Sequence, residues 1–293
     1  MTKLFYILLI CLCVSGCSDE GMLISEQVFF GGGGTIAVPE TTIGGVPPEL
    51  QVLLWGDRDT LMQQLLDLET DNAAAAEVLL EQICLIDAQR VYYNRYIDAG
   101  GIAIVGNKRV PDTLFLEARD IVLAMTSKRP EVRARLSSMR FYQILVLSGD
   151  ATIREIPELW IPSGWPDDEA DPWNVAGTCI TGTRRYCVSE VRLRGKQPWM
   201  RVFIHEFAHA IHLGMLYEPS LQDPLQTAYD TAVEAGRWHR IIHEYWAHAV
   251  ERWFLNVGTG KDWETYEAFA EHDPLLAALL DEWFPRISLE RGY

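Results

Sequence analysis

"IHEFAHAIH" at residues 204–212 places three histidines and one glutamate in a run that otherwise has the apolar pattern of a buried helix. Residues four apart lie on one face of an α-helix, so His205 and His209 can direct two imidazoles to the same point. Glu206 lies beside this pair, where its carboxylate can take a proton from a water on a metal ion. The spacing therefore predicts a Zn²⁺ site, with Glu206 as the catalytic general base.

A catalytic zinc ion usually has three protein ligands and a position open to water, so a third ligand has to come from elsewhere. Metzincins continue as HExxHxxGxxH, but this chain has His212 in place of the glycine and Met215 in place of the last histidine, which excludes that class. A GxxxD sequence at residues 258–262 is a weak alternative in an expected loop. The stronger candidate is Glu244 in "HEYWAHAVERWF", at the edge of the apolar stripe of a second predicted helix.

The composition is that of a folded protein with an acidic surface. The chain has 293 residues, of which 48% are hydrophobic, and this is enough to bury a core of its own. The formal net charge is −16 at pH 7. Nucleic-acid binding needs a basic surface that releases counterions from phosphates, so we expect no nucleic-acid partner.

The N-terminus has the pattern of an export signal. "MTKLFYILLICLCVSGC" contains Lys3, an apolar run too short to span a bilayer, and then a small residue before Cys17. This ending is typical of a bacterial lipobox, in which residues 1–16 are removed and Cys17 receives lipid. The alternative is an ordinary signal peptide with a coincidental cysteine. We expect an exported monomer at the outer membrane or cell surface, held to the membrane only by this lipid.

Two further cysteines are a disulfide candidate. Cys179 and Cys187 lie on either side of a turn-like segment, and an exported protein folds in an oxidising compartment where such a pair can close a small loop. Two free thiols are the alternative. Cys84 lies in a helical run and is expected to be a buried thiol.

The rest of the chain predicts a helix-rich α+β architecture. Gly- and Pro-rich residues 17–48 suit a tether, and residues 49–293 are expected to form one domain. Residues 157–199 have the texture of long loops with a hairpin, and residues 141–149 are the best strand candidate. Apolar periodicity predicts helices within residues 57–69, 72–97, 112–138, 198–215, 224–257 and 263–283.

The two motifs together resemble a known class of enzymes. HEFAH followed by "EYWA" on a later helix is similar to the gluzincin peptidases, particularly the catalytic domain of the anthrax lethal factor type and its secreted relatives. The likeness extends over roughly residues 85–285, including "YYNRYIDAGGIAIV" and "IPELWIPSGWPDD". It implies a zincin-like metallopeptidase domain with a small sheet, an HExxH active-site helix, a peptide or protein substrate, and Glu244 as the third zinc ligand.

The chain departs from that pattern at two places. Where the family has a second glutamate one turn after the ligand, this chain has His248, which either orients a ligand or competes for the metal. The family tyrosine that stabilises the tetrahedral intermediate is absent, and His239 is the candidate substitute as oxyanion donor, with Tyr229 behind it. His212, one turn after His209, is expected to support a ligand rather than bind the metal.

Three functions are consistent with these residues. The first is a zinc metallopeptidase that hydrolyses peptide bonds through a zinc-bound water activated by Glu206. The second is a non-catalytic or weakly active surface-anchored binding protein on a peptidase fold. The third is a zinc hydrolase of cell-wall amides, which the sequence does not separate from a peptidase.

Overall fold

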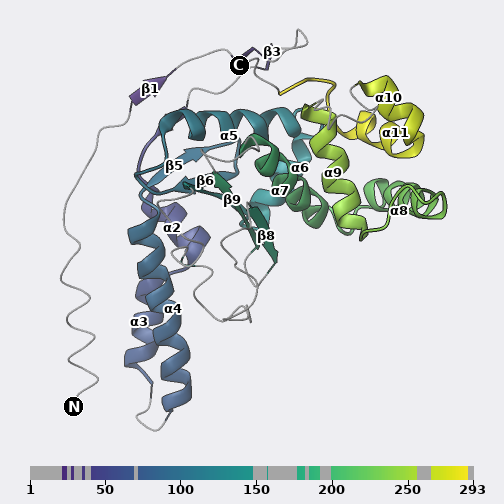
Figure 1. The fold of residues 1–293 in the computed structure, drawn as a ribbon. Helices are drawn as coiled ribbons and strands as arrows, with labels where there is room; N and C mark the ends of the chain where they lie inside the picture. Colours follow the sequence, from purple (N-terminus) through teal and green to yellow (C-terminus); the bar gives the residue numbers. More distant parts are fainter. Residues whose placement is uncertain are drawn as a thin grey trace.

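The structure is a computed structural model that describes residues 22–24, 28–29, 35–36, 41–68, 72–147, 157, 177–181, 185–191, 199–255 and 265–289. Figure 1 shows a helix-rich α+β architecture with a small central sheet and the HExxH helix beside it, which confirms the predicted fold class. None of the helices in the described ranges has both the length and the apolarity that crossing a bilayer requires.

The helices account for most of the described chain. Their bounds are α2 (Pro48–Trp55), α3 (Arg58–Leu66), α4 (Ala73–Tyr92), α5 (Asp112–Met125), α6 (Pro130–Ser138), α7 (Trp199–Gly214), α8 (Pro219–Glu234), α9 (Ile242–Leu255), α10 (Tyr266–His272) and α11 (Pro274–Trp283). The strands are β1 (Met22–Ile24), β2 (Val28–Phe29), β3 (Thr35–Ile36), β4 (Thr41–Ile43), β5 (Arg95–Asp98), β6 (Ala103–Gly106), β7 (Tyr142–Leu147), β8 (Gly177–Thr181) and β9 (Arg185–Val191).

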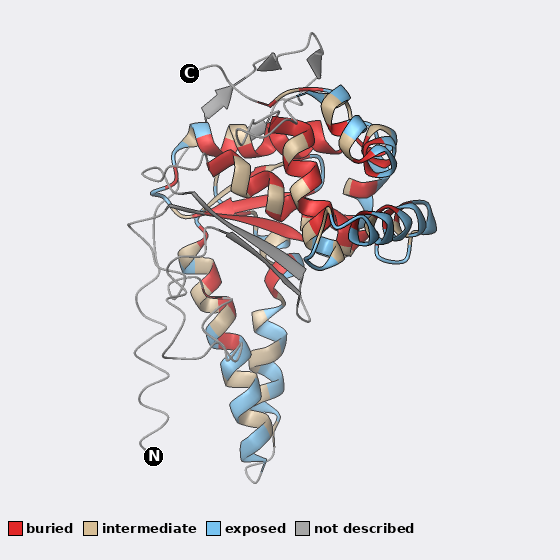
Figure 2. Ribbon diagram, turned by 45° about the vertical axis from the view of Figure 1, so that its right-hand side comes forward, coloured by how far each residue is buried: buried red, intermediate tan, exposed pale blue. Residues whose placement is uncertain are grey.

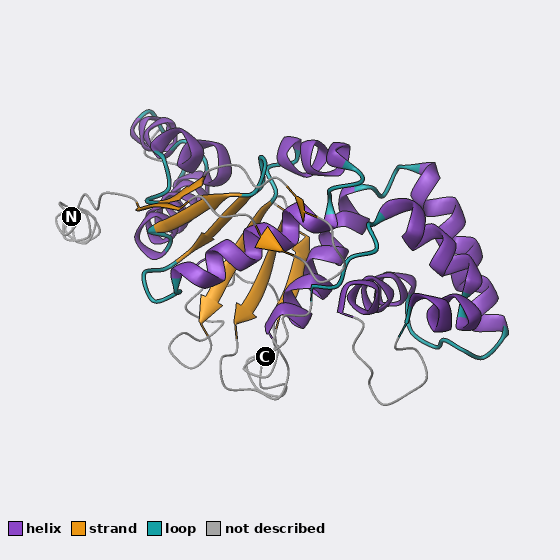
Figure 3. Cartoon of the chain, turned by 90° about the horizontal axis from the view of Figure 1, so that it is seen from above, coloured by secondary structure: helices purple, strands orange, loops and turns teal. Residues whose placement is uncertain are grey.

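The central sheet has the strand order β5-β6-β7-β9-β8. The pairs β6–β7 and β7–β9 are parallel, whereas both edge strands pair antiparallel. Successive side chains of a strand point to opposite faces, and β6 follows this rule: Ile104 belongs to a core with residues of α5 and α7, while Val105 belongs to a second core with residues of α2 and α4. Helices therefore cover both faces of the sheet, as Figure 3 shows from above.

Residues at the end of the predicted tether (17–48) join these cores. Ile43 and Val46 are buried, and Gly44 forms a bridge with Tyr96 of β5. Residues 1–21, which contain the predicted leader and Cys17, lie outside the described part of the chain. The division into leader, tether and domain stays a prediction.

Three helical predictions differ from the structure. The helix expected over residues 72–97 ends at Tyr92, and residues 95–98 form β5 because they pair with β6. In the turn between these strands, the Asp98 carboxylate accepts hydrogen bonds from Gly100 N and Gly101 N. The helix expected over residues 224–257 is broken into α8 and α9. Gly236 lies in the break, two residues after the end of α8. Its φ of 68° is in the left-handed region that glycine adopts without strain.

The third difference is at the C-terminal end, where residues 263–283 form two helices rather than one. Asp273 separates α10 from α11, and Pro274 is the first residue of α11. Proline lacks the backbone N–H that would continue the preceding helix, and it is favoured at a helix start.

The pairing of α7 with α9 positions the predicted site. Phe203 and Phe207 of α7 are fully buried, with ring centroids 6.4 Å apart. Trp246 of α9 is also fully buried, and its indole N–H donates to Ala208 O of α7 at 2.9 Å. Gly214 lets α7 approach α6, because a Cβ there would lie 2.6 Å from Leu136 Cδ2. Packing and a buried hydrogen bond therefore fix α7 and α9 relative to each other.

Candidate metal centre

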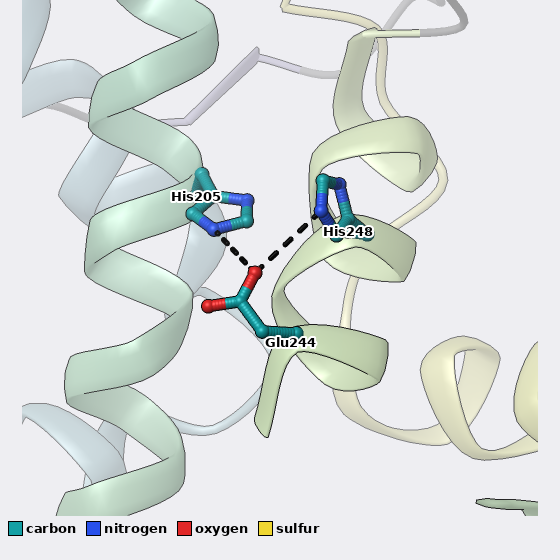
Figure 4. Close-up of side chains that lie close together, drawn as sticks. All are labelled: His205, Glu244 and His248. Carbon is teal, nitrogen blue, oxygen red and sulfur yellow. Dashed lines mark ion pairs between the residues drawn. The ribbon is translucent and has the colours of Figure 1, made fainter. Parts of the chain in front are cut away.

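Four side chains from α7 and α9 meet where these helices face each other. His205 and His209 come from successive turns of α7, and Glu244 and His248 from successive turns of α9. Figure 4 shows the carboxylate of Glu244 between the imidazoles of His205 and His248. The structure thus brings Glu244 close to both histidines of HExxH, and its role as a metal ligand stays a prediction.

Three of these residues lie close enough together to share one metal ion, although the two histidines approach different oxygens of Glu244. His205 Nε2 and His209 Nε2 are 3.2 Å apart, His209 Nε2 is 3.4 Å from Glu244 Oε1, and His205 Nε2 is 3.7 Å from Glu244 Oε2. In a tetrahedral site with zinc bonds of about 2.0–2.1 Å, neighbouring ligand atoms lie about 3.3 Å apart. Two imidazole nitrogens and a carboxylate are also donors that zinc prefers. The three residues could hold one ion with small side-chain movements.

A second set of ligands overlaps the first. One nitrogen from His205, one from His248 and one oxygen from Glu244 all lie within 4.8 Å of one another, and His248 Nε2 is 3.6 Å from Glu244 Oε2. The two sets share His205 and Glu244. His248 and His209 are thus both within reach of an ion held by that shared pair.

Glu251 of α9 orients His205 from behind. Its Oε2 is 3.3 Å from His205 Nδ1, and its Oε1 accepts a hydrogen bond from Arg201 Nε. Burial would raise the pKa of Glu251, but the hydrogen bond with His205 and the charge of Arg201 together lower it below its ordinary value. The ionised carboxylate accepts the Nδ1–H of His205, which leaves the Nε2 lone pair for a metal.

The two HExxH histidines differ strongly in basicity. Burial, together with the charge of the neighbouring His205, lowers the pKa of His209 to about 3. Burial also acts to lower the pKa of His205, but the hydrogen bond with Glu251 and the charges of Glu206 and Glu244 raise it above its ordinary value. Without a cation, the short contact between the two Nε2 atoms requires a proton on one of them. A metal would take the place of that proton.

Glu206 is a buried carboxyl group beside the cluster. Glu206 is 8% exposed. Burial and, to a smaller extent, the charge of Glu244 outweigh the lowering effect of His205 and raise the pKa of Glu206 to about 7. A carboxyl group with a pKa near neutrality can accept and return a proton at physiological pH. The environment of Glu206 is therefore suited to general acid–base chemistry.

The other predicted site residues lie farther from the cluster. His239 is exposed, and its ring contacts Trp238 with centroids 6.2 Å apart. The Tyr229 hydroxyl donates to Arg240 O at 3.0 Å. His212 is buried, with Nε2 3.2 Å from Gln222 Oε1 of α8. The role of His239 as an oxyanion donor and that of His212 as a support both stay predictions.

The sequence analysis did not assign roles to three residues that contact the cluster. Glu251 is one, and Arg240 is another, since its Nη1 lies 3.2 Å from His248 Nε2 and 3.7 Å from Glu244 Oε2. His243 is the third: its exposed ring is 5.6 Å from that of His209 between centroids. Spacing of three or four residues relates Arg240, which precedes α9, to Glu244, His248 and Glu251 within it, and this periodicity was the available signal.

The disulfide candidate lies in the hairpin of β8 and β9. The backbone register pairs Cys179 with Cys187 directly across these antiparallel strands. Residues so paired have Cα atoms about 4.5–5.5 Å apart, within the range that a disulfide spans. The two side chains lie outside what the structure describes, so the disulfide stays a prediction. The prediction that Cys84 is buried is wrong, because this residue of α4 is exposed.

Comparison with known proteins gives one distant structural likeness. No protein-family description matches the chain. No curated protein matches it either. Among solved structures, the Pro-Pro endopeptidase PPEP-2 from Paenibacillus alvei is similar over 58% of this chain and 91% of that chain, with 19% sequence identity and a TM-score of 0.39. At this level of similarity, conclusions about function rest on the site itself.

Proposed function

We propose that the protein is a zinc metallopeptidase that hydrolyses peptide bonds. The observation that supports it most is the convergence of two imidazole Nε2 atoms and the Glu244 carboxylate, at separations of 3.2–3.7 Å, beside the buried Glu206. His205, His209 and Glu244 would hold the ion. The role of Glu244 agrees with the resemblance to gluzincins.

The chemistry divides between the ion and the chain. Bound zinc would polarise the scissile carbonyl and bring the pKa of a coordinated water to about 7. Glu206 would accept the proton of the attacking water and then donate it to the nitrogen of the leaving amine. Glu251 would hold His205 through Nδ1, and Arg201 would hold Glu251 in turn.

Glu206→Gln tests the general-base role. The substitution keeps the shape of the side chain but removes its ability to take a proton, so we expect peptide hydrolysis to fall by about 10²–10⁴-fold while zinc content is unchanged. Glu234→Gln, at the exposed end of α8, is the matched control and should hydrolyse peptides like the original protein. Normal turnover in Glu206→Gln would show that another group is the base.

A second candidate function is a metal-bearing surface protein with little or no hydrolytic activity. The position of His248, 3.6 Å from Glu244 Oε2, favours it, because a fourth protein ligand would compete with the water that catalysis needs. Cell-wall amides are a further candidate substrate for the same zinc chemistry. Hydrolysis assays on unstructured peptides and on cell-wall fragments separate the three functions, since the binding protein would act on neither.

We also propose, from sequence alone, that the chain is exported and anchored through lipid on Cys17. Replacing the acylated cysteine removes the only expected membrane contact. Fractionation of cells that produce Cys17→Ala should therefore find the protein away from membranes, and continued membrane association would disprove the anchor.

A further inference from the structure

His248 is placed as a metal ligand would be. It follows Glu244 by one helical turn on α9, and its Nε2 lies 3.6 Å from Glu244 Oε2. Its ring centroid is 4.8 Å from that of His205, on the opposite side of the Glu244 carboxylate (Figure 4). The side chain is 26% exposed and borders a cavity of about 20 Å³ lined also by Trp238 and Arg252, so one of its sides is not tightly packed.

One carboxylate faces the back of both imidazoles. Glu251 Oε2 is 3.3 Å from His205 Nδ1 and 3.7 Å from His248 Nδ1. Histidines that bind metals through one ring nitrogen commonly donate the other N–H to a carboxylate, which fixes the orientation of the ring. Glu251 can do this for both residues, because an ionised carboxylate has several lone pairs. Both Nε2 atoms are thereby turned toward Glu244.

Arg240 occupies the lone pair that a metal would take. Its Nη1 lies 3.2 Å from His248 Nε2. A guanidinium has only donors, so this contact requires the unprotonated Nε2 as acceptor, and the same lone pair would bind a metal ion. The Arg240 side chain is 56% exposed and can withdraw into solvent. His248 can therefore exchange between two cationic partners without a change in the backbone.

We propose that His248 is a fourth protein ligand, so that His205, His209, Glu244 and His248 enclose the resting metal ion. When His248 leaves the ion and frees a coordination position, Arg240 binds His248 Nε2. This inference rests on the proposed zinc centre and adds a restriction to it. A catalytic site needs a position for water, whereas four protein ligands are typical of closed sites. The chain would accordingly retain its metal more tightly, and hydrolyse more slowly, than an open three-ligand site.

Cobalt substitution of the full chain reports the coordination directly, independently of activity. Metal-free protein would be loaded with Co²⁺, and its visible d–d absorption recorded for the original chain, His248→Ala and His239→Ala. Removal of the fourth ligand should change the spectrum, because water replaces a nitrogen donor, and should weaken Zn²⁺ binding by about 10-fold or more in chelator competition. His239→Ala removes an exposed imidazole outside the cluster and should match the original chain in both measurements.

A separate variant tests whether Arg240 competes with the metal ion for His248 Nε2. Arg240→Gln removes the competing cation, so Zn²⁺ should bind more tightly, and the Co²⁺ spectrum should stay that of the four-ligand site. If His248→Ala shows no thermal unfolding transition and so does not fold, His248→Gln, which keeps a polar side chain of similar length, repeats the ligand test.

The outcomes separate this inference from the proposed function. An original chain that binds neither Zn²⁺ nor Co²⁺ overturns both. An original chain that binds one ion, with the same affinity and the same Co²⁺ spectrum in both His248 variants, overturns the fourth ligand and leaves the three-ligand enzyme intact.

Discussion

The helix pair α7–α9 and the helix pair α3–α4 use similar residues with opposite results. α3 has no buried residue, and α4 buries little beyond Ile83, Ile86 and Gln89, so the exposed colours of Figure 2 dominate this arm. Its polar groups satisfy one another near solvent: Arg58 Nε donates to Asp87 Oδ1 at 2.6 Å. Most residues of α7 and α9 are buried, yet these helices bring histidines and carboxylates together.

The difference lies in what completes each set of charges. The pair of Arg58 and Asp87 is already a cation with an anion. In α7–α9, two Nε2 atoms face each other at 3.2 Å, with the carboxylates of Glu206, Glu244 and Glu251 around them. Buried polar groups are costly unless they are paired, and the contact between the two Nε2 atoms needs a proton or a metal ion between them. Burial turns an ordinary helix-surface pattern into a cluster that could hold a metal ion.

The largest expected contrast is in stability. Phe203→Ala removes a fully buried ring from the α7 core and should lower the free energy of unfolding by about 3–5 kcal/mol. Leu66→Ala, at a residue 72% exposed on α3, should change it by no more than about 0.5 kcal/mol. Urea denaturation measures both, and comparable losses would mean that the two helix pairs are packed alike.

The next contrast is in metal affinity. Glu251→Gln removes the charge that holds His205 Nδ1 and should weaken Zn²⁺ binding by about 10–100-fold in chelator competition. Glu81→Gln makes the same chemical change at an exposed position of α4 and should leave affinity unaltered. Equal affinities in the two variants would remove Glu251 from the metal centre.

The smallest effect on stability is expected from the partly exposed ion pair of Arg58 and Asp87. Asp87→Asn should cost at most about 1 kcal/mol of unfolding free energy, because the Arg58 and Asp87 side chains are 21% and 32% exposed and water screens their attraction. The cost should shrink further in denaturation at high salt. A loss that is larger, or that salt does not change, would mean that this arm depends on its ion pair as the site depends on its charges.

Local spacing explains which parts of the site the sequence predicted. The interval of four residues between His205 and His209 is enough to place both on one face of a helix, whatever the rest of the chain does. Glu244 was identified as a carboxylate at the edge of an apolar stripe. The spacing also places Arg240 and Glu251 on the stripe of Glu244 and His248, but the contact of Glu251 with His205 depends on how α9 lies against α7, which local spacing does not reveal.

The errors in the fold have a similar origin. Residues 95–98 continue an apolar helical pattern, but pairing with residues 103–106 makes them a strand, and a partner in a sheet is not visible in local periodicity. The glycine at 236 was a visible stop signal inside the helix predicted over residues 224–257. That break matters for the site, because it lets α9 begin at Ile242 and face α7 independently of α8.

Zinc binding by purified full-length protein, measured by equilibrium dialysis alongside a variant that carries both His205→Ala and His209→Ala, tests the central claim most directly. The original chain should bind about one Zn²⁺ per chain, as a single tetrahedral site does, and the double variant should bind none at the same free zinc concentration. An original chain without zinc, or a double variant that binds as much as the original, would contradict a metal centre between α7 and α9.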